Sequence, residues 1–389
     1  MNKGLFQIVY IITVFAVSAF SCANAKKAST IKDVYAKDTL VFPVKANSIY
    51  TLRKNFDLKG NVYLMPEGVT IKKRNGVIMN GTLIGNKTKM EVSQPVFDKV
   101  TIKGEWNVPI ICSSMFRELN YVNSLKDVIA LSNPSVNNTI EIEPGNYIVS
   151  AEWNKGALQL YSNTKLILNG TVTLKANNYT ECYVLLIKDA HNVTVIGQGA
   201  LIGDKDEHLG SKGEWGMGID ISNSQSVVIS DISISNCWGD CIYVGGNSRD
   251  VNICNCILSN ARRQGVSVTS AKGVVIEDCF ISDISGTLPG CGVDIETNKE
   301  CVVSDVTIKN LTITRCTSGI ETNGHAKNSK VTGISIENCQ ITDIKGGKHI
   351  VCYNTSDTEI KSCSFDNSVK RAIKLQDCER VKHSRCRTL

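Results

Sequence analysis

Apolar and polar residues alternate in short runs throughout the second half of the chain. Apolar side chains at alternate positions are typical of strands that bury one face. One such run recurs at intervals of 23 to 34 residues, at 193–195, 227–229, 251–253, 274–276, 306–308 and 334–336.

A second run, which begins with a small residue, lies between the copies of the first, at 218–221, 241–244, 265–268, 292–295 and 319–322. Two parallel strands in each repeat of about 23 residues predict a coil whose strands stack into sheets, a parallel β-helix. The repeat is clearest over residues 157–380. We assign the whole coil the range 116–389.

Residues 26–110 carry shorter β-like runs, and the chain's best helix pattern follows at 116–131. We interpret 26–115 as a β region that caps the coil, because an open coil end would expose strand edges. The helix would lie between the two parts.

The first 25 residues place one lysine before a long apolar run that ends in small residues. This layout is typical of a secretory signal peptide. Two processing routes remain open: cleavage after Ala23-Asn24-Ala25, or a lipoprotein signal in which Cys22 carries a lipid anchor. We therefore expect an exported protein, in the periplasm, on the outer membrane or outside the cell.

Composition narrows the function. The net charge of +6 is dispersed, without the dense basic clusters of a nucleic-acid-binding surface. An exported chain with 16 cysteines suggests disulfides. Several cysteines, however, follow a polar residue at similar positions of successive repeats, which favours a buried column of free thiols. No pair of CxxC motifs predicts a zinc site.

The second run also predicts a chemical face, because the residue between its two apolar positions must point outward. Those outward residues are Asp220, Tyr243, Ser267, Asp294 and Glu321. Strands of neighbouring coils lie about 4.8 Å apart, so their carboxylates could stack closely. Paired carboxylates at such spacings carry out glycoside hydrolysis, and crowding keeps one of them protonated.

The chain resembles the pectin-lyase-like superfamily of right-handed parallel β-helix proteins, particularly its bacterial and phage-tailspike members, over most of residues 140–380. The blocks that carry the resemblance are IEPGNY (142–147), GQGALIGD (197–204), GEWGMG (213–218), WGDCIY (238–243), NARRQG (260–265) and GVDIETN (292–298). The resemblance implies an all-β solenoid fold and a carbohydrate polymer as partner. The superfamily also includes lyases, epimerases and binding proteins, so it does not fix one activity.

Polygalacturonases of this superfamily carry Asn-Thr-Asp-Gly, Asp-Asp-Cys, Gly-His-Gly and Arg-Ile-Lys on successive coils. The present chain keeps only Asp240 of the Asp pair, has Arg263-Gln264-Gly265 in place of the histidine motif, and has Asp294-Ile295-Glu296 in place of Arg-Ile-Lys. Two acids at that place would repel a uronate. A hydrolase of plain galacturonan is therefore disfavoured.

We predict a polysaccharide-degrading glycoside hydrolase without a cofactor, acting on a neutral, amino or otherwise modified sugar. Its predicted catalytic residues are Asp240, Asp294 and Glu296, and its predicted substrate-binding residues are Glu214, Trp215, Tyr243, Arg263, Gln264 and Glu321. Two other functions remain open: a lyase or epimerase of a uronic acid polymer, in which an arginine or Ca²⁺ would neutralise the carboxylate, and a non-catalytic surface glycan-binding protein.

Overall fold

The computed structural model describes residues 39–92 and 95–389. The predicted signal segment at 1–25, including Cys22, lies outside these residues. Within them, no helix is both long and apolar enough to cross a membrane.

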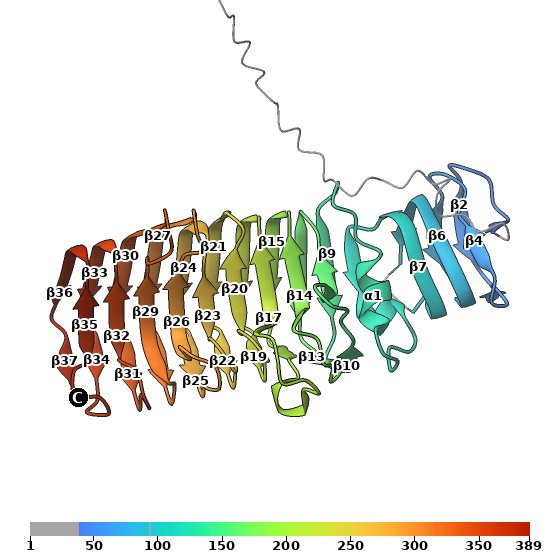
Figure 1. Cartoon of the computed structure of the whole chain (residues 1–389). Helices are drawn as coiled ribbons and strands as arrows, with labels where there is room; N and C mark the ends of the chain where they lie inside the picture. The colour runs from blue at the N-terminus through green and yellow to red at the C-terminus, as the bar shows by residue number, and fades with distance from the viewer. Residues whose placement is uncertain (1–38, 93–94) are drawn as a thin grey trace, which may run out of the picture. The chain divides into compact units, whose positions relative to one another are not determined.

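Three parallel sheets form the coil, and their strands follow one another in chain order (Figure 1). Apart from the first two strands of one sheet, neighbouring strands in a sheet are three strands apart in the chain, so each turn of the coil contributes one strand to each sheet. This is the predicted parallel β-helix.

The nine-stranded sheet carries the predicted chemical face. Its strands are β11 (Gly156–Leu160), β14 (Glu181–Lys188), β17 (Trp215–Ser222), β20 (Ile242–Gly245), β23 (Val266–Val268), β26 (Cys291–Glu296), β29 (Ser318–Asn323), β32 (Ile350–Tyr353) and β35 (Ile373–Gln376).

The eleven-stranded sheet contains the first of the two predicted runs. Its strands are β8 (Ile110–Cys112), β9 (Asn138–Ile142), β12 (Thr164–Leu168), β15 (His191–Ile196), β18 (Gln225–Ser230), β21 (Ser248–Cys254), β24 (Ala271–Glu277), β27 (Val302–Lys309), β30 (Lys330–Glu337), β33 (Ser356–Lys361) and β36 (Glu379–Ser384).

The ten-stranded sheet corrects the prediction of two strands per repeat, because it adds a third. Most of its strands have only two or three residues and bury one or two of them, too few to show alternation. They are β10 (Asn146–Val149), β13 (Thr171–Leu174), β16 (Ala200–Ile202), β19 (Ser233–Ser235), β22 (Ile257–Ser259), β25 (Phe280–Ser282), β28 (Thr312–Thr314), β31 (Gln340–Thr342), β34 (Ser364–Phe365) and β37 (Arg387–Thr388).

A separate seven-stranded parallel sheet precedes the coil. It contains β1 (Leu40–Val41), β2 (Ile49–Leu52), β3 (Phe56–Asp57), β4 (Val62–Leu64), β5 (Thr70–Lys73), β6 (Ile78–Glu91) and β7 (Phe97–Asn107). The predicted helix is present but shorter, as α1 (Ser124–Ile129), which packs against β7, β10 and β11. Two short 3-10 helices, η2 (Ser113–Met115) and η3 (Lys205–Glu207), complete the elements of the described residues.

Inward side chains of successive coils stack into the core. In the nine-stranded sheet one such column consists of fully buried aliphatic residues, Ile219, Ile242, Val266, Val293, Ile320 and Ile350. Burial of each of these side chains contributes about 1.5–3 kcal/mol. The core therefore holds each strand in one register, which fixes the residues on the outer face.

The Asn-Cys pairs have a structural explanation in the corners of the coil. Asn236, Asn255 and Asn338 have positive φ angles of 59°, 52° and 51°, a backbone region that asparagine tolerates better than most residues. The cysteine that follows each of them is buried and free. All fifteen cysteines within the described residues are free, as the repeat pattern predicted.

Candidate active site

The predicted column of outward residues is present in register. Across β17, β20, β23, β26 and β29, the aligned residues are Asp220, Tyr243, Ser267, Asp294 and Glu321. Glu296 lies two residues beyond Asp294 on β26 and pairs with Asn323 of β29. Acidic side chains from several coils are thus placed on one strip of the nine-stranded sheet.

Arg263, in the turn before β23, is the centre of this strip. Its Nη1 atom lies 3.3 Å from Oδ2 of Asp240, and its Nη2 atom lies 2.8 Å from Oε1 of Glu296. Its Nε atom is 3.7 Å from Oε2 of Glu214. One guanidinium therefore lies among three carboxylates that come from three different coils.

Asp294 is held from the neighbouring coil. The amide nitrogen of Gln264 donates a hydrogen bond of 2.9 Å to Asp294 Oδ2. The amide oxygen of Gln264 accepts a 2.7 Å hydrogen bond from the backbone of Cys291, which fixes the amide orientation. The Asp294 Oδ1 atom has no hydrogen-bond partner among the described residues.

Burial makes Asp294 hard to ionise. Desolvation first, and then the negative charges of Glu296 and Glu321, raise its pKa well above the ordinary value, while Arg263 acts in the opposite direction. Its carboxyl group is therefore protonated under conditions in which a surface aspartate is charged. A neutral carboxyl can donate a proton.

Three further carboxyls near the strip have raised pKa values. Burial raises the pKa of Asp240 to about 6, although Arg263 and a 2.6 Å hydrogen bond from Ser267 oppose the shift. Burial also raises the pKa of Asp220 to about 6. The pKa of Glu321 is raised by burial and then by Glu296.

The strip is less open than an outward column suggests. The exposed fraction of Asp240 is 0% and that of Asp294 is 1%, whereas the Glu296 side chain is 31% exposed and that of Glu214 is 47% exposed. Arg263 and Gln264, from another coil, bond to the two buried aspartates. Glu296 is therefore the predicted catalytic residue with the most direct access to a ligand.

Two predicted binding residues lie at the edge of this centre. The hydroxyl of Tyr243 shares a 2.8 Å hydrogen bond with Thr269, and burial raises the pKa of Tyr243. Trp215 begins β17, is 49% exposed and aligns with Glu181 of β14. The structure thus gathers Asp240, Asp294, Glu296, Glu214, Arg263 and Gln264, with Glu321 in register beside Asp294.

A stack of side chains behind the centre was not foreseen. The rings of His208 and Trp238 are 4.0 Å apart and nearly parallel, and the Arg262 guanidinium lies 3.9 Å from the centre of the Trp238 ring. Asp204 Oδ2 lies 2.9 Å from Nδ1 of His208. These residues come from three turns far apart in sequence, so only the register of the coils brings them together.

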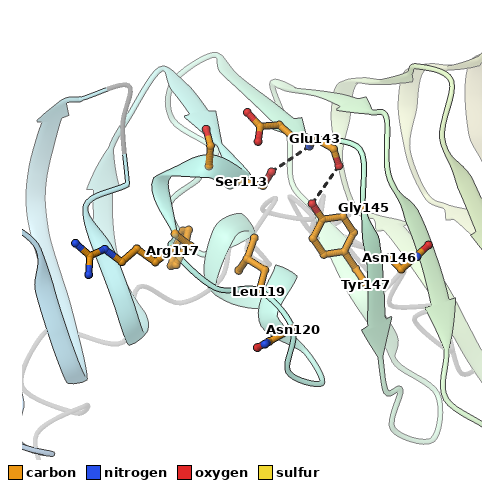
Figure 2. A pocket seen from close by; sticks show the side chains of 10 residues that line it. Ser113, Arg117, Leu119, Asn120, Glu143, Gly145, Asn146 and Tyr147 are labelled. Atoms are coloured by element: carbon orange, nitrogen blue, oxygen red, sulfur yellow. Dashed lines mark hydrogen bonds between the residues drawn. The ribbon is translucent and has the colours of Figure 1, made fainter.

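A separate hollow of about 290 Å³ lies between the segment 113–120, which follows β8, and the residues 143–147 at the start of β10. Figure 2 shows two hydrogen bonds within it: Ser113 Oγ accepts from the Glu143 backbone at 3.0 Å, and Tyr147 donates to the Glu143 carbonyl at 3.0 Å. Arg117 pairs with Asp98 at 3.4 Å. We interpret this hollow as structural.

No group of three or more histidine, cysteine or acidic side chains suited to holding a metal ion occurs in the part of the chain that the structure describes. The strip offers the buried Asp294 carboxyl, whose pKa is raised, the partly exposed Glu296 and the Arg263 guanidinium, which bonds to Glu296 and Asp240.

The fold and the repeated register define a parallel β-helix protein. The family model "Right handed beta helix region" matches residues 136–333 and 289–388. The chain belongs to this right-handed β-helix family.

Two curated relatives come from Bacillus subtilis strain 168. The uncharacterized protein YclG is 30% identical over 189 residues, which cover 41% of this chain and 32% of YclG. The SPbeta prophage-derived uncharacterized protein YorA is 29% identical over 200 residues, covering 43% of this chain and 34% of YorA. The matched part is about a third of each relative's length.

Among solved structures, a hyperthermoactive exopolygalacturonase from Thermotoga maritima is 12% identical, with a TM-score of 0.49. The match covers 73% of this chain and 93% of that chain.

Proposed function

We propose that the protein is an exported, polysaccharide-degrading glycoside hydrolase that acts on a glycan other than plain galacturonan. The observation that carries the proposal is the position of the buried Asp294, whose pKa is raised by burial, beside a partly exposed Glu296, both held by side chains of the neighbouring coil. Glycoside hydrolysis commonly uses one carboxylic acid and one carboxylate, and it needs no cofactor.

Asp294 would be the general acid and Glu296 the general base or nucleophile. They point to the same face, and their Cα atoms are two residues apart on one strand, about 6.6 Å. Asp240 is fully buried and bonded to Arg263, so its role in this proposal is to position Arg263 and, through it, Glu296.

Glu321 is the alternative candidate for the general acid. Asp294 reaches a substrate only if the side chains above it are displaced, and catalytic contacts often tighten only in the substrate complex. Glu321 lies in register beside Asp294, is more exposed, and also has a raised pKa. Glu214, Trp215 and Tyr243 would contact sugar units along the same face.

The arginines support hydrolysis over a lyase or epimerase reaction. A lyase must neutralise the carboxylate of a uronic acid, a task for a free arginine or a cation such as Ca²⁺. Arg263 already lies among three carboxylates. Arg262 stacks on Trp238 and donates a 2.6 Å hydrogen bond to the Gly213 carbonyl. Neither guanidinium is available for a uronate.

Three variants separate the roles, tested on a glycan that the wild-type protein cuts. Loss of a general acid or base costs about 100- to 10,000-fold in rate. We therefore expect Glu296→Gln and Asp294→Asn to lose kcat by that factor, and Glu321→Gln to act mainly on KM.

The outcomes differ for each alternative. If Glu321→Gln is inactive while Asp294→Asn keeps its rate, Glu321 is the acid. If the wild-type protein binds a glycan without cutting it and Asp294→Asn changes only the affinity, the protein is a surface glycan-binding protein.

A further inference from the structure

A second hollow, of about 240 Å³, opens beside Glu321 on the same face as the carboxylates. Glu321 aligns with Asp294 in one direction and with Val351 in the other, so the hollow begins one coil beyond the proposed reaction centre. Both Glu321 and Val351 line it.

The hollow results from unequal turn lengths. The turn before β29 has three residues (315–317), whereas the turns before β26 and β32 have eight (283–290) and seven (343–349). A short turn between two longer ones leaves a gap. Leu288, Pro289 and the segment 346–348 form its two sides.

Backbone hydrogen bonds hold these sides in place. The amide of Ser318 donates to the Gly290 carbonyl at 3.0 Å, and the amide of Gly347 donates to the Thr317 carbonyl at 2.8 Å. A Cβ atom on Gly347 would lie 1.7 Å from the Ser318 hydroxyl, so this turn requires glycine to pack so closely. The hollow is therefore formed before any ligand arrives.

The lining suits a sugar. Thr317, Ser318 and Tyr353 carry hydroxyls, Lys348 and Glu321 carry one charge of each sign, and Pro289 and Val351 are apolar. Pockets that enclose drug-sized ligands have volumes of roughly 300–1,000 Å³. A smaller hollow with mixed polar and apolar walls fits a single monosaccharide unit.

The surrounding charges favour an uncharged unit. The lining contains one acidic residue, Glu321, and one basic residue, Lys348. Asp294 and Glu296 lie on the adjoining strand. Lys374, on the other side, donates a 3.1 Å hydrogen bond to the Tyr353 hydroxyl and is thereby engaged. A uronate bound in the hollow would lie next to the acidic Glu321. Lys348 would be the one basic side chain of the lining near it.

We propose that this hollow is a subsite for one uncharged sugar unit of the glycan, directly beside the reaction centre. Its place in a cleaved polymer rests on the proposed function, but its affinity for a sugar does not.

Saturation-transfer NMR with free monosaccharides tests the subsite without any turnover. The probes are galactose and N-acetylglucosamine, which are uncharged, and galacturonate. We expect both uncharged sugars to bind the wild-type protein and galacturonate to bind about tenfold more weakly. Thr317→Trp, which fills the hollow, should abolish binding, and Lys348→Met should weaken it about tenfold.

A matched control is Thr312→Trp, on the same coil but in the ten-stranded sheet, which should bind like the wild-type protein. Circular dichroism shows whether Thr317→Trp is folded. If it is not, the binding of sugars to Lys348→Met tests the subsite by itself. The subsite is wrong if no uncharged sugar binds, if galacturonate binds as tightly as galactose, or if the variants bind normally. Sugar binding that Thr317→Trp abolishes, in a protein that cuts no polymer, would support the subsite while removing the proposed function.

Discussion

At the scale of single residues, Asp294 and Glu321 lie in register on one face of the nine-stranded sheet, and Asp294 is buried there while Glu321 is half-buried. Alternation in the second run predicts that Asp294 and Glu321 share one face, because a strand places every second side chain on the same side. Arg263 and Gln264 reach these acids from another coil. Contacts of that kind depend on three-dimensional register and leave no local pattern in the sequence.

Arg263 should control the alkaline side of the reaction's pH profile, because the proposed general acid Asp294 acts only while it is protonated. It lowers the pKa of both Asp240 and Asp294, against the larger effect of burial. Removing its charge in Arg263→Met should therefore raise both pKa values. We expect a lower kcat and a profile whose alkaline limb moves to higher pH. An unmoved alkaline limb would show that the pKa of Asp294 does not set the profile.

The free energy of unfolding should fall as the pH rises, because Asp220 loses its proton. Its folded pKa, about 6, lies above its ordinary value of 3.8. The folded state therefore binds the proton more tightly, and the stability that this proton contributes is lost as the pH rises from about 4 through 6. The shift corresponds to roughly 3 kcal/mol.

Urea unfolding at several values of pH measures this effect. Asp220→Asn should have a flatter decline in unfolding free energy between pH 4 and 7 than the wild-type protein. Asp305→Asn, at an exposed site, is the control. Equal slopes for Asp220→Asn and the wild-type protein would contradict the prediction.

At the scale of elements, two of the three strands in each coil could be read from the sequence. The third has three residues in most coils, for example Ser233–Ser235 and Thr312–Thr314, and buries only one of them. A single apolar residue cannot show the alternation of apolar and polar positions by which a strand is predicted. The corner asparagines were visible as Asn-Cys pairs, but their positive φ angles explain them only once the coil is known.

These corners give a prediction about stability. Asn255 is exposed and has a φ of 52°. A residue with a Cβ atom and no polar group pays about 1–2 kcal/mol in this region, and glycine does not. Asn255→Ala should therefore lower the unfolding free energy by about 1 kcal/mol, and Asn255→Gly by less. Chemical denaturation measures both, and an equal loss in the two variants would show that backbone conformation is not the cause.

At the scale of the whole molecule, the repeat length was enough to predict the β-helix, because one set of inward positions recurs on every coil. The hollow beside Glu321 was not predictable in the same way. It arises from turns of three, seven and eight residues that become neighbours only when the coils stack. The fold therefore follows from what the coils share, and the candidate site from where they differ.

The most direct test is a digestion of a broad glycan panel, followed by two measurements on each sample: new reducing ends, and absorbance near 235 nm from unsaturated products. The proposal predicts reducing ends without that absorbance from at least one glycan other than galacturonan, and their loss in Asp294→Asn and Glu296→Gln. Absorbance near 235 nm, or cleavage that survives both substitutions, would contradict hydrolysis by these carboxylates.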